Sequence, residues 1–158
     1  MSEIGDIIQE KCLAFSDRVI KLNDYLLEQA ASRKSEGRSQ KEDTRRGKTL
    51  TSSVFPHPSV PIHLQAVATL ANQLLRAGTS IGANNAEATN AISKADFKSK
   101  SYIALKEARE SLYWIDLLHR NNYIDEKAYQ SIYNDCEELV KILVARCKKL
   151  DENNVNTK

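Results

Sequence analysis

The stretch Leu74–Arg120, LLRAGTSIGANNAEATNAISKADFKSKSYIALKEARESLYWIDLLHR, holds two amphipathic patterns separated by a short polar break. On both sides of the break, apolar and small residues recur every three or four positions, which is the spacing of an α-helix. Ser93 followed by Asp96 resembles a helix-capping pair, with Asp in place of the usual Glu or Gln. The stretch therefore predicts helices over 62–90 and 94–120 joined by a tight, antiparallel turn.

The same spacing continues on both flanks of this hairpin. It predicts a helix over 4–31 and, after the polar turn RNNYID, a helix over 125–150 with Asp125 as its cap. The apolar positions of these two helices are Ile4, Ile8, Cys12, Phe15, Val19, Leu22 and Leu26, and Ala128, Ile132, Cys136, Leu139, Leu143, Cys147 and Leu150. We expect a single all-α domain over 1–150, an up-down-up-down antiparallel four-helix bundle, followed by a disordered tail over 151–158.

Composition agrees with one compact helical domain. The chain has 158 residues, 41% of them hydrophobic and only 6% aromatic. Its three cysteines, an odd number, fall on apolar helical positions, so we expect buried thiols in a reducing compartment. No apolar run approaches the roughly 20 residues that cross a bilayer, so we expect a cytoplasmic protein without membrane contact.

A basic insert over 32–61 separates the first two predicted helices. Between residues 32 and 49, seven cations against three acids leave a net charge of +4. The cations are Arg33, Lys34, Arg38, Lys41, Arg45, Arg46 and Lys48. Clustered Lys and Arg can bind nucleic-acid phosphates, whereas a flexible loop without a ligand is the alternative interpretation.

Polar residues form a second pattern, on the inner hairpin. They are Arg76, Ser80, Asn84 and Glu87 on one helix, at steps of four, four and three, and Glu107, Glu110 and Trp114 on the other. Arg76 paired with Glu107 or Glu110, with hydrogen bonds from Ser80 and Asn84, would fix helix register or the oligomer partner. Catalysis or metal binding by the two glutamates is the alternative, but the Glu-x-x-His pairs of di-iron bundles are absent.

Two glycines on the same helix predict close packing. Gly78 and Gly82 lie one turn apart among alanines, so another helix can approach closely there, although a ligand groove is the alternative. The three histidines, His57, His63 and His119, do not combine with the cysteines into a recognisable catalytic set. We therefore expect no enzymatic activity and no cofactor.

The segments QLLRAGTSIGANNAEA, over 73–88, and SKADFKSKSYIALKEARESLYWIDLL, over 93–118, resemble a family of bacterial four-helix bundle proteins. These proteins are encoded by intervening sequences in large-subunit ribosomal RNA genes. The resemblance rests on the runs Arg-x-x-x-Ser-Ile-x-x-Asn-x-x-Glu and Ala-Leu-x-Glu-Ala-x-Glu-x-x-Tyr-Trp. This chain departs from the family pattern in its insert and in Asn85, whose position is commonly apolar.

The resemblance implies a ring-shaped homo-oligomer, a pentamer, similar to the accessory proteins of diversity-generating retroelements, which bind reverse transcriptase and nucleic acid. Two functions remain open at this point. The first is a non-catalytic oligomeric scaffold that acts with such a nucleic-acid-associated complex. The second is a stand-alone RNA- or DNA-binding protein encoded in a ribosomal RNA intervening sequence.

Overall fold

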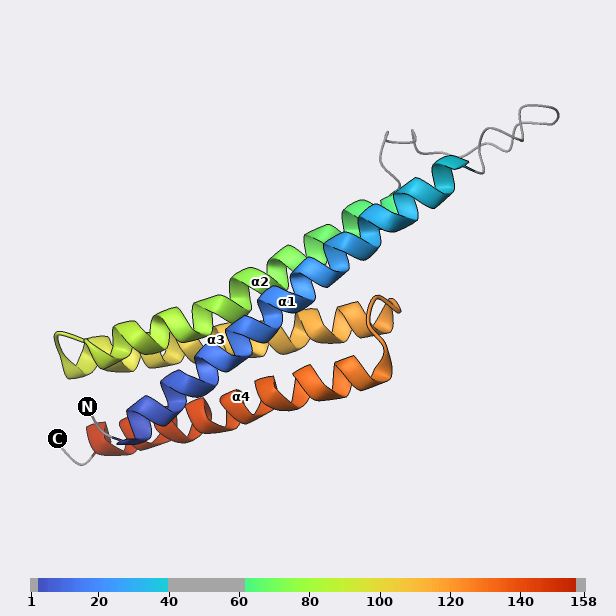
Figure 1. Ribbon diagram of the computed structural model, residues 1–158. Helices are drawn as coiled ribbons and strands as arrows, with labels where there is room; N and C mark the ends of the chain where they lie inside the picture. The colour runs from blue at the N-terminus through green and yellow to red at the C-terminus, as the bar shows by residue number, and fades with distance from the viewer. Residues whose placement is uncertain (1–2, 40–61, 156–158) are drawn as a thin grey trace, which may run out of the picture.

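The computed structural model describes residues 3–39 and 62–155, with side chains for residues 5–32 and 65–152. These residues form α1 (Glu3–Ser39), α2 (Ile62–Thr89), α3 (Lys94–Arg120) and α4 (Glu126–Val155). Each helix packs along the next one in the sequence, and a smaller contact between α1 and α4 completes the bundle (Figure 1). The predicted all-α four-helix bundle is confirmed. α1 and α3 lie at diagonal corners of the bundle.

α1 is longer than its apolar pattern predicted. The helix continues to Ser39, past the predicted end at residue 31, so the first part of the predicted insert is helical and residues 40–61 lie outside the described residues. Residues 32–39 include Arg, Lys and Glu, which are good helix formers. In Figure 1 this end of α1 extends past the turn between α3 and α4. The apolar periodicity of the sequence ends before the helix does, because an apolar stripe marks the face on which a helix packs and not the length of the helix.

α4 is also longer than predicted. It continues to Val155, whereas the sequence predicted a helix end at residue 150 and a disordered tail from residue 151. Asp151 holds this end against α3, because it forms an ion pair of 2.8 Å with Lys98 and accepts a hydrogen bond of 2.5 Å from the Tyr102 hydroxyl. The segment also contains no Gly or Pro before Val155 that would end a helix.

The two short turns of the bundle carry helix caps. At the start of α3, the Ser93 hydroxyl accepts a hydrogen bond of 3.1 Å from the Asp96 amide, and the Asp96 carboxylate accepts one of 3.2 Å from the Ile92 amide. At the start of α4, the Asp125 carboxylate accepts a hydrogen bond of 2.7 Å from the Ala128 amide. The bonds from the Asp96 and Ala128 amides satisfy donors that the first turn of a helix leaves free, and the bond from the Ile92 amide holds the residue before the cap.

The core runs the length of the bundle. Its largest fully buried apolar side chains are Phe15, Leu26, Leu74, Ile81, Ile115, Leu118, Leu139 and Leu143. α1 and α2 approach closely at the two glycines, as predicted. A Cβ atom on Gly78 would lie 3.1 Å from one methyl of Val19, and a Cβ atom on Gly82 would lie 3.4 Å from Cβ of Cys12. Small residues are needed at Gly78 because the Val19 methyls occupy the adjoining space.

No helix within residues 3–39 and 62–155 is both long and apolar enough to cross a membrane.

Candidate functional site

The polar stripe predicted on α2 makes one contact within its own helix and one with α3. Arg76 and Glu87 are exposed, whereas Ser80 and Asn84 are half-buried. The Asn84 side chain donates a hydrogen bond of 2.8 Å to the carbonyl oxygen of Ser80, one turn earlier in the same helix. Glu87 forms an ion pair with Lys100 of α3. The hydrogen bond and charge of Glu87 raise the pKa of Lys100, so this pair joins α2 to α3 through a lysine that was not part of the predicted polar network.

The predicted partners on α3 also interact with each other. Trp114 Nε1 donates a hydrogen bond of 3.0 Å to the Glu110 carboxylate, one turn away. Burial raises the pKa of Glu107, as does the charge of Glu110, while the guanidinium of Arg76 opposes the shift. Arg76 therefore acts on Glu107 through its charge, although no ion pair within 4.0 Å joins Arg76 to either glutamate among the described residues.

A different polar cluster links three helices inside the bundle. The Asn85 side chain on α2 is fully buried. Its amide nitrogen donates a hydrogen bond of 2.5 Å to Gln9 Oε1 on α1, and its amide oxygen accepts one of 2.7 Å from Arg146 Nη1 on α4. We call Gln9, Asn85 and Arg146 the amide–arginine cluster. Its hydrogen bonds satisfy an amide that would otherwise be costly to bury.

Arg146 carries a positive charge into this cluster. Its guanidinium lies 5.7 Å from the ring centre of Phe97 on α3, so all four helices contribute to its surroundings. Burial lowers the pKa of Arg146. Sequence reasoning marked Asn85 as unusual but missed Gln9 and Arg146. The available signal was the position of Asn85 on the inner face between Ile81 and Ala88, because a buried amide requires polar partners.

The three cysteines are free thiols, and each is buried. Burial raises the pKa of Cys12 to about 11, and Arg146 opposes this shift. Burial raises the pKa of Cys136 to about 12 and also raises the pKa of Cys147. Because the thiolate is the reactive form of cysteine, these environments oppose nucleophilic chemistry.

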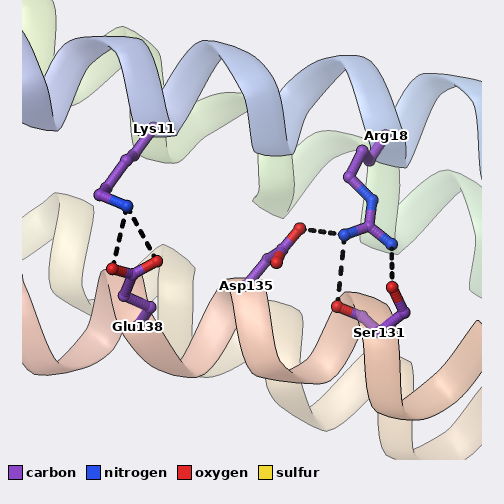
Figure 2. Close-up of polar contacts among 5 residues, drawn as sticks. All are labelled: Lys11, Arg18, Ser131, Asp135 and Glu138. Carbon is purple, nitrogen blue, oxygen red and sulfur yellow. Dashed lines mark hydrogen bonds and ion pairs between the residues drawn. The ribbon is translucent and has the colours of Figure 1, made fainter.

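Polar side chains bridge the seam between α1 and α4, as Figure 2 shows. Lys11 Nζ lies 2.9 Å and 3.0 Å from the two carboxylate oxygens of Glu138. Arg18 forms an ion pair with Asp135, donates a hydrogen bond of 2.8 Å to the Ser131 hydroxyl, and donates another of 3.3 Å to the Ser131 carbonyl oxygen. These contacts set the alignment of the two helices, although partly exposed ion pairs each contribute little stability.

His119 and three neighbouring side chains connect the helices at the turn between α3 and α4. His119 Nε2 lies 3.0 Å from a Glu126 carboxylate oxygen, and the imidazole stacks on the Tyr129 ring with 4.1 Å between ring centres. The Tyr129 hydroxyl in turn donates a hydrogen bond of 2.9 Å to Asp116. His119 thus joins the end of α3 to the start of α4. Among the described residues, no group of three His, Cys, Asp or Glu side chains is arranged to bind a metal ion.

The basic insert falls mostly outside the described structure. Arg33, Lys34 and Arg38 lie on the last turns of α1, in the part whose side chains are not described. Lys41, Arg45, Arg46 and Lys48 lie outside the described residues. Nucleic-acid binding by these residues therefore stays a prediction.

Comparison with known proteins places this bundle in a family. Residues 48–145, more than half of the chain, match the profile of the 23S rRNA-intervening sequence protein. The chain is also similar to the crystal structure of a protein of unknown function from the S23 ribosomal protein family of Bacteroides thetaiotaomicron VPI-5482. The two are 34% identical, the match covers 92% of this chain and 98% of that one, and the TM-score is 0.65. No match was found among curated proteins. The chain belongs to the 23S rRNA-intervening sequence protein family.

Proposed function

We propose that the protein is a non-catalytic, homo-oligomeric helical scaffold that acts with a nucleic-acid-associated complex in the cytoplasm. A reverse transcriptase of a diversity-generating retroelement is the kind of partner we propose, together with RNA or DNA. The observation that carries the homo-oligomer is an apolar line on the outer surface of α1. Leu13, Ile20 and Leu27 follow one another at intervals of seven residues, and 57%, 42% and 42% of their surfaces are exposed.

This line is an unusual feature for a helix that already has a buried face. Residues seven apart lie nearly above one another on an α-helix, so the three side chains form a narrow apolar stripe beside the core stripe. Such stripes at heptad spacing pack against another helix in coiled-coil seams. Isolated exposed apolar residues are common on soluble proteins, but a stripe of three supports a protein contact.

Sedimentation velocity or mass photometry tests the homo-oligomer. We expect a discrete assembly at micromolar concentration, with a mass that is a multiple of the 17.8 kDa chain, and a pentamer is the specific prediction. A monomer at that concentration would contradict the scaffold. The non-catalytic part of the proposal is supported by the raised pKa values of Cys12 and Cys136, which keep both thiols protonated.

The alternative function is a stand-alone RNA- or DNA-binding protein. The basic character of residues 32–49, with seven cations against three acids, favours it. Electrostatic binding of nucleic acid weakens with salt in proportion to the number of phosphates neutralised. Fluorescence anisotropy with labelled RNA and DNA at a series of salt concentrations measures this directly. Absence of binding at low salt would leave the protein-binding scaffold.

A further inference from the structure

The surface of α1 that carries the apolar line is also acidic. Glu10, Asp17 and Asp24 are exposed and alternate with Leu13, Ile20 and Leu27 at steps of three and four residues. We call these six residues the acidic ridge. Within residues 5–32, the cations Lys11 and Arg18 are already paired with α4. Lys21 is therefore the one remaining cation on this part of α1, against five carboxylates.

The outer surface of α3 has the opposite charge. Lys106, Arg109, Tyr113 and Arg120 are exposed, and 56% of the Tyr113 surface is accessible. We call these four residues the basic ridge. Its three cations form no ion pair with another described residue. Two carboxylates near it are already hydrogen-bonded within the subunit, Glu110 to Trp114 and Asp116 to Tyr129.

The two ridges match in spacing as well as in charge. The charged residues of the two ridges, from Glu10 to Asp24 and from Lys106 to Arg120, each cover fourteen steps of helix, which is about 21 Å at 1.5 Å per residue. Positions on both ridges follow the three-and-four spacing of a helix–helix seam. The acidic ridge carries three exposed carboxylates, and the basic ridge carries three exposed cations. The exposed ring of Tyr113 offers an aromatic surface on which apolar side chains can pack.

We infer that the acidic ridge of one copy packs against the basic ridge of a second copy, in a head-to-tail contact between α1 and α3. This inference rests on the proposed homo-oligomer and specifies its interface. A twofold contact between two α1 ridges would bring acidic side chains together, which is unfavourable. α1 and α3 occupy diagonal corners of the bundle, so each copy presents the two ridges on different sides and has one free ridge after pairing. When such a contact repeats from copy to copy, the copies form a closed ring if the rotation between neighbours is a whole fraction of a full turn.

Complementary disruption of the two ridges tests the inference with the full chain. Leu13→Asp/Ile20→Asp damages only the acidic ridge, and Lys106→Asp/Arg109→Asp damages only the basic ridge. Circular dichroism and thermal melting establish that both variants fold. Ala14→Asp on α1 and Lys127→Asp on α4 are the controls, because both positions are exposed and lie outside the ridges.

We expect each double variant to be a monomer by sedimentation velocity at micromolar concentration, and the two controls to assemble as the unmodified chain does. A 1:1 mixture of the double variants should then give a heterodimer of twice the 17.8 kDa chain mass, because each partner retains one intact ridge. Assembly of either double variant alone would overturn the inference. Two variants that remain monomers after mixing would also overturn it, because the intact basic ridge of one variant would then have failed to bind the intact acidic ridge of the other.

Other outcomes separate this inference from the proposed function. If the unmodified chain is an oligomer and the double variants assemble normally, the α1–α3 contact is wrong but the scaffold stands. If the unmodified chain is a monomer, both are wrong. Binding of a labelled oligouridine that is lost in Lys106→Asp/Arg109→Asp, with assembly unchanged, would make the basic ridge a nucleic-acid surface and overturn the inference.

Discussion

Arg146 on α4 donates a hydrogen bond of 2.7 Å to the side-chain oxygen of Asn85 on α2, inside the bundle. The same Asn85 amide donates to Gln9 on α1, so one side chain fixes the positions of three helices. A buried amide with two directional partners tolerates fewer helix alignments than an apolar side chain does. We attribute the alignment of α1, α2 and α4 at this level to the amide–arginine cluster.

Replacement of Asn85 should be costly. We expect Asn85→Ala to reduce the free energy of unfolding by about 1 to 3 kcal/mol, because it leaves donors of Arg146 and an acceptor of Gln9 without partners. Asn84→Ala is the matched control, since Asn84 is half-buried and bonds only to the Ser80 carbonyl. Urea denaturation measures both. If Asn85→Ala and Asn84→Ala lowered the free energy of unfolding by the same small amount, the amide–arginine cluster would not stabilise the fold.

Substitutions at Gly82 test the close approach of α1 and α2. A Cβ atom at this position meets Cβ of Cys12 at 3.4 Å, which is an ordinary contact. Gly82→Ala should therefore be tolerated and can gain up to about 1 kcal/mol in helix propensity. Gly82→Leu should cost about 1 to 3 kcal/mol, because its longer side chain has to displace α1. Thermal melting distinguishes them, and an unchanged midpoint for the leucine variant would mean that the groove at Gly82 is open.

Acid should loosen the last turns of α4. Lys98 and the Tyr102 hydroxyl lower the pKa of Asp151 below its usual value of 3.8. The carboxylate therefore stabilises the folded state above pH 3.8, and this contribution is lost as the pH falls through the lowered pKa. The protection factors of amides near residue 151, which compare the observed exchange rate with the intrinsic rate at the same pH, should fall in that acidic range. In Asp151→Asn the same amides should exchange faster at neutral pH, and equal rates in the two proteins at neutral pH would refute the anchoring role.

The basic insert should supply nucleic-acid affinity, if the protein binds nucleic acid. Neutralising Arg33, Lys34, Arg45 and Arg46 with Gln should weaken RNA or DNA binding and flatten its salt dependence. The log–log slope should change by roughly 0.9 for each duplex phosphate that the variant no longer neutralises. Lys21, Lys127, Lys141 and Lys149 changed to Gln form the charge-matched control, since all four are exposed on helices. If both variants lost the same amount of nucleic-acid affinity, the loss would reflect the net charge of the chain and not the position of the insert.

Local sequence patterns predicted the helices because their causes are local. The Ser93–Asp96 cap and the apolar spacing of Phe15 and Val19 can be read within a few residues. The predicted end of α1 was wrong for a physical reason: residues 32–39 include the helix-forming residues Arg, Lys and Glu although they continue no apolar stripe. An apolar stripe therefore located the part of each helix that is buried, rather than the whole helix.

The candidate site was harder to predict because its contacts are distant in sequence. Asn85 bonds to Gln9, 76 positions away, and to Arg146, 61 positions away, and no local pattern links them. The predicted pairing of Arg76 with the α3 glutamates assumed a rotation of the two helices that spacing alone does not determine. In the structure, Glu110 bonds to Trp114 on its own helix, and Glu87 takes Lys100 as its partner.

The mass of the unmodified protein in solution tests the central claim most directly. Sedimentation equilibrium at micromolar concentration should give one discrete assembly, with the pentamer at five times the 17.8 kDa chain mass. The apolar line of Leu13, Ile20 and Leu27 predicts assembly, because assembly would remove it from water, whereas the number five rests on the family resemblance. A single species of 17.8 kDa at that concentration would contradict the scaffold.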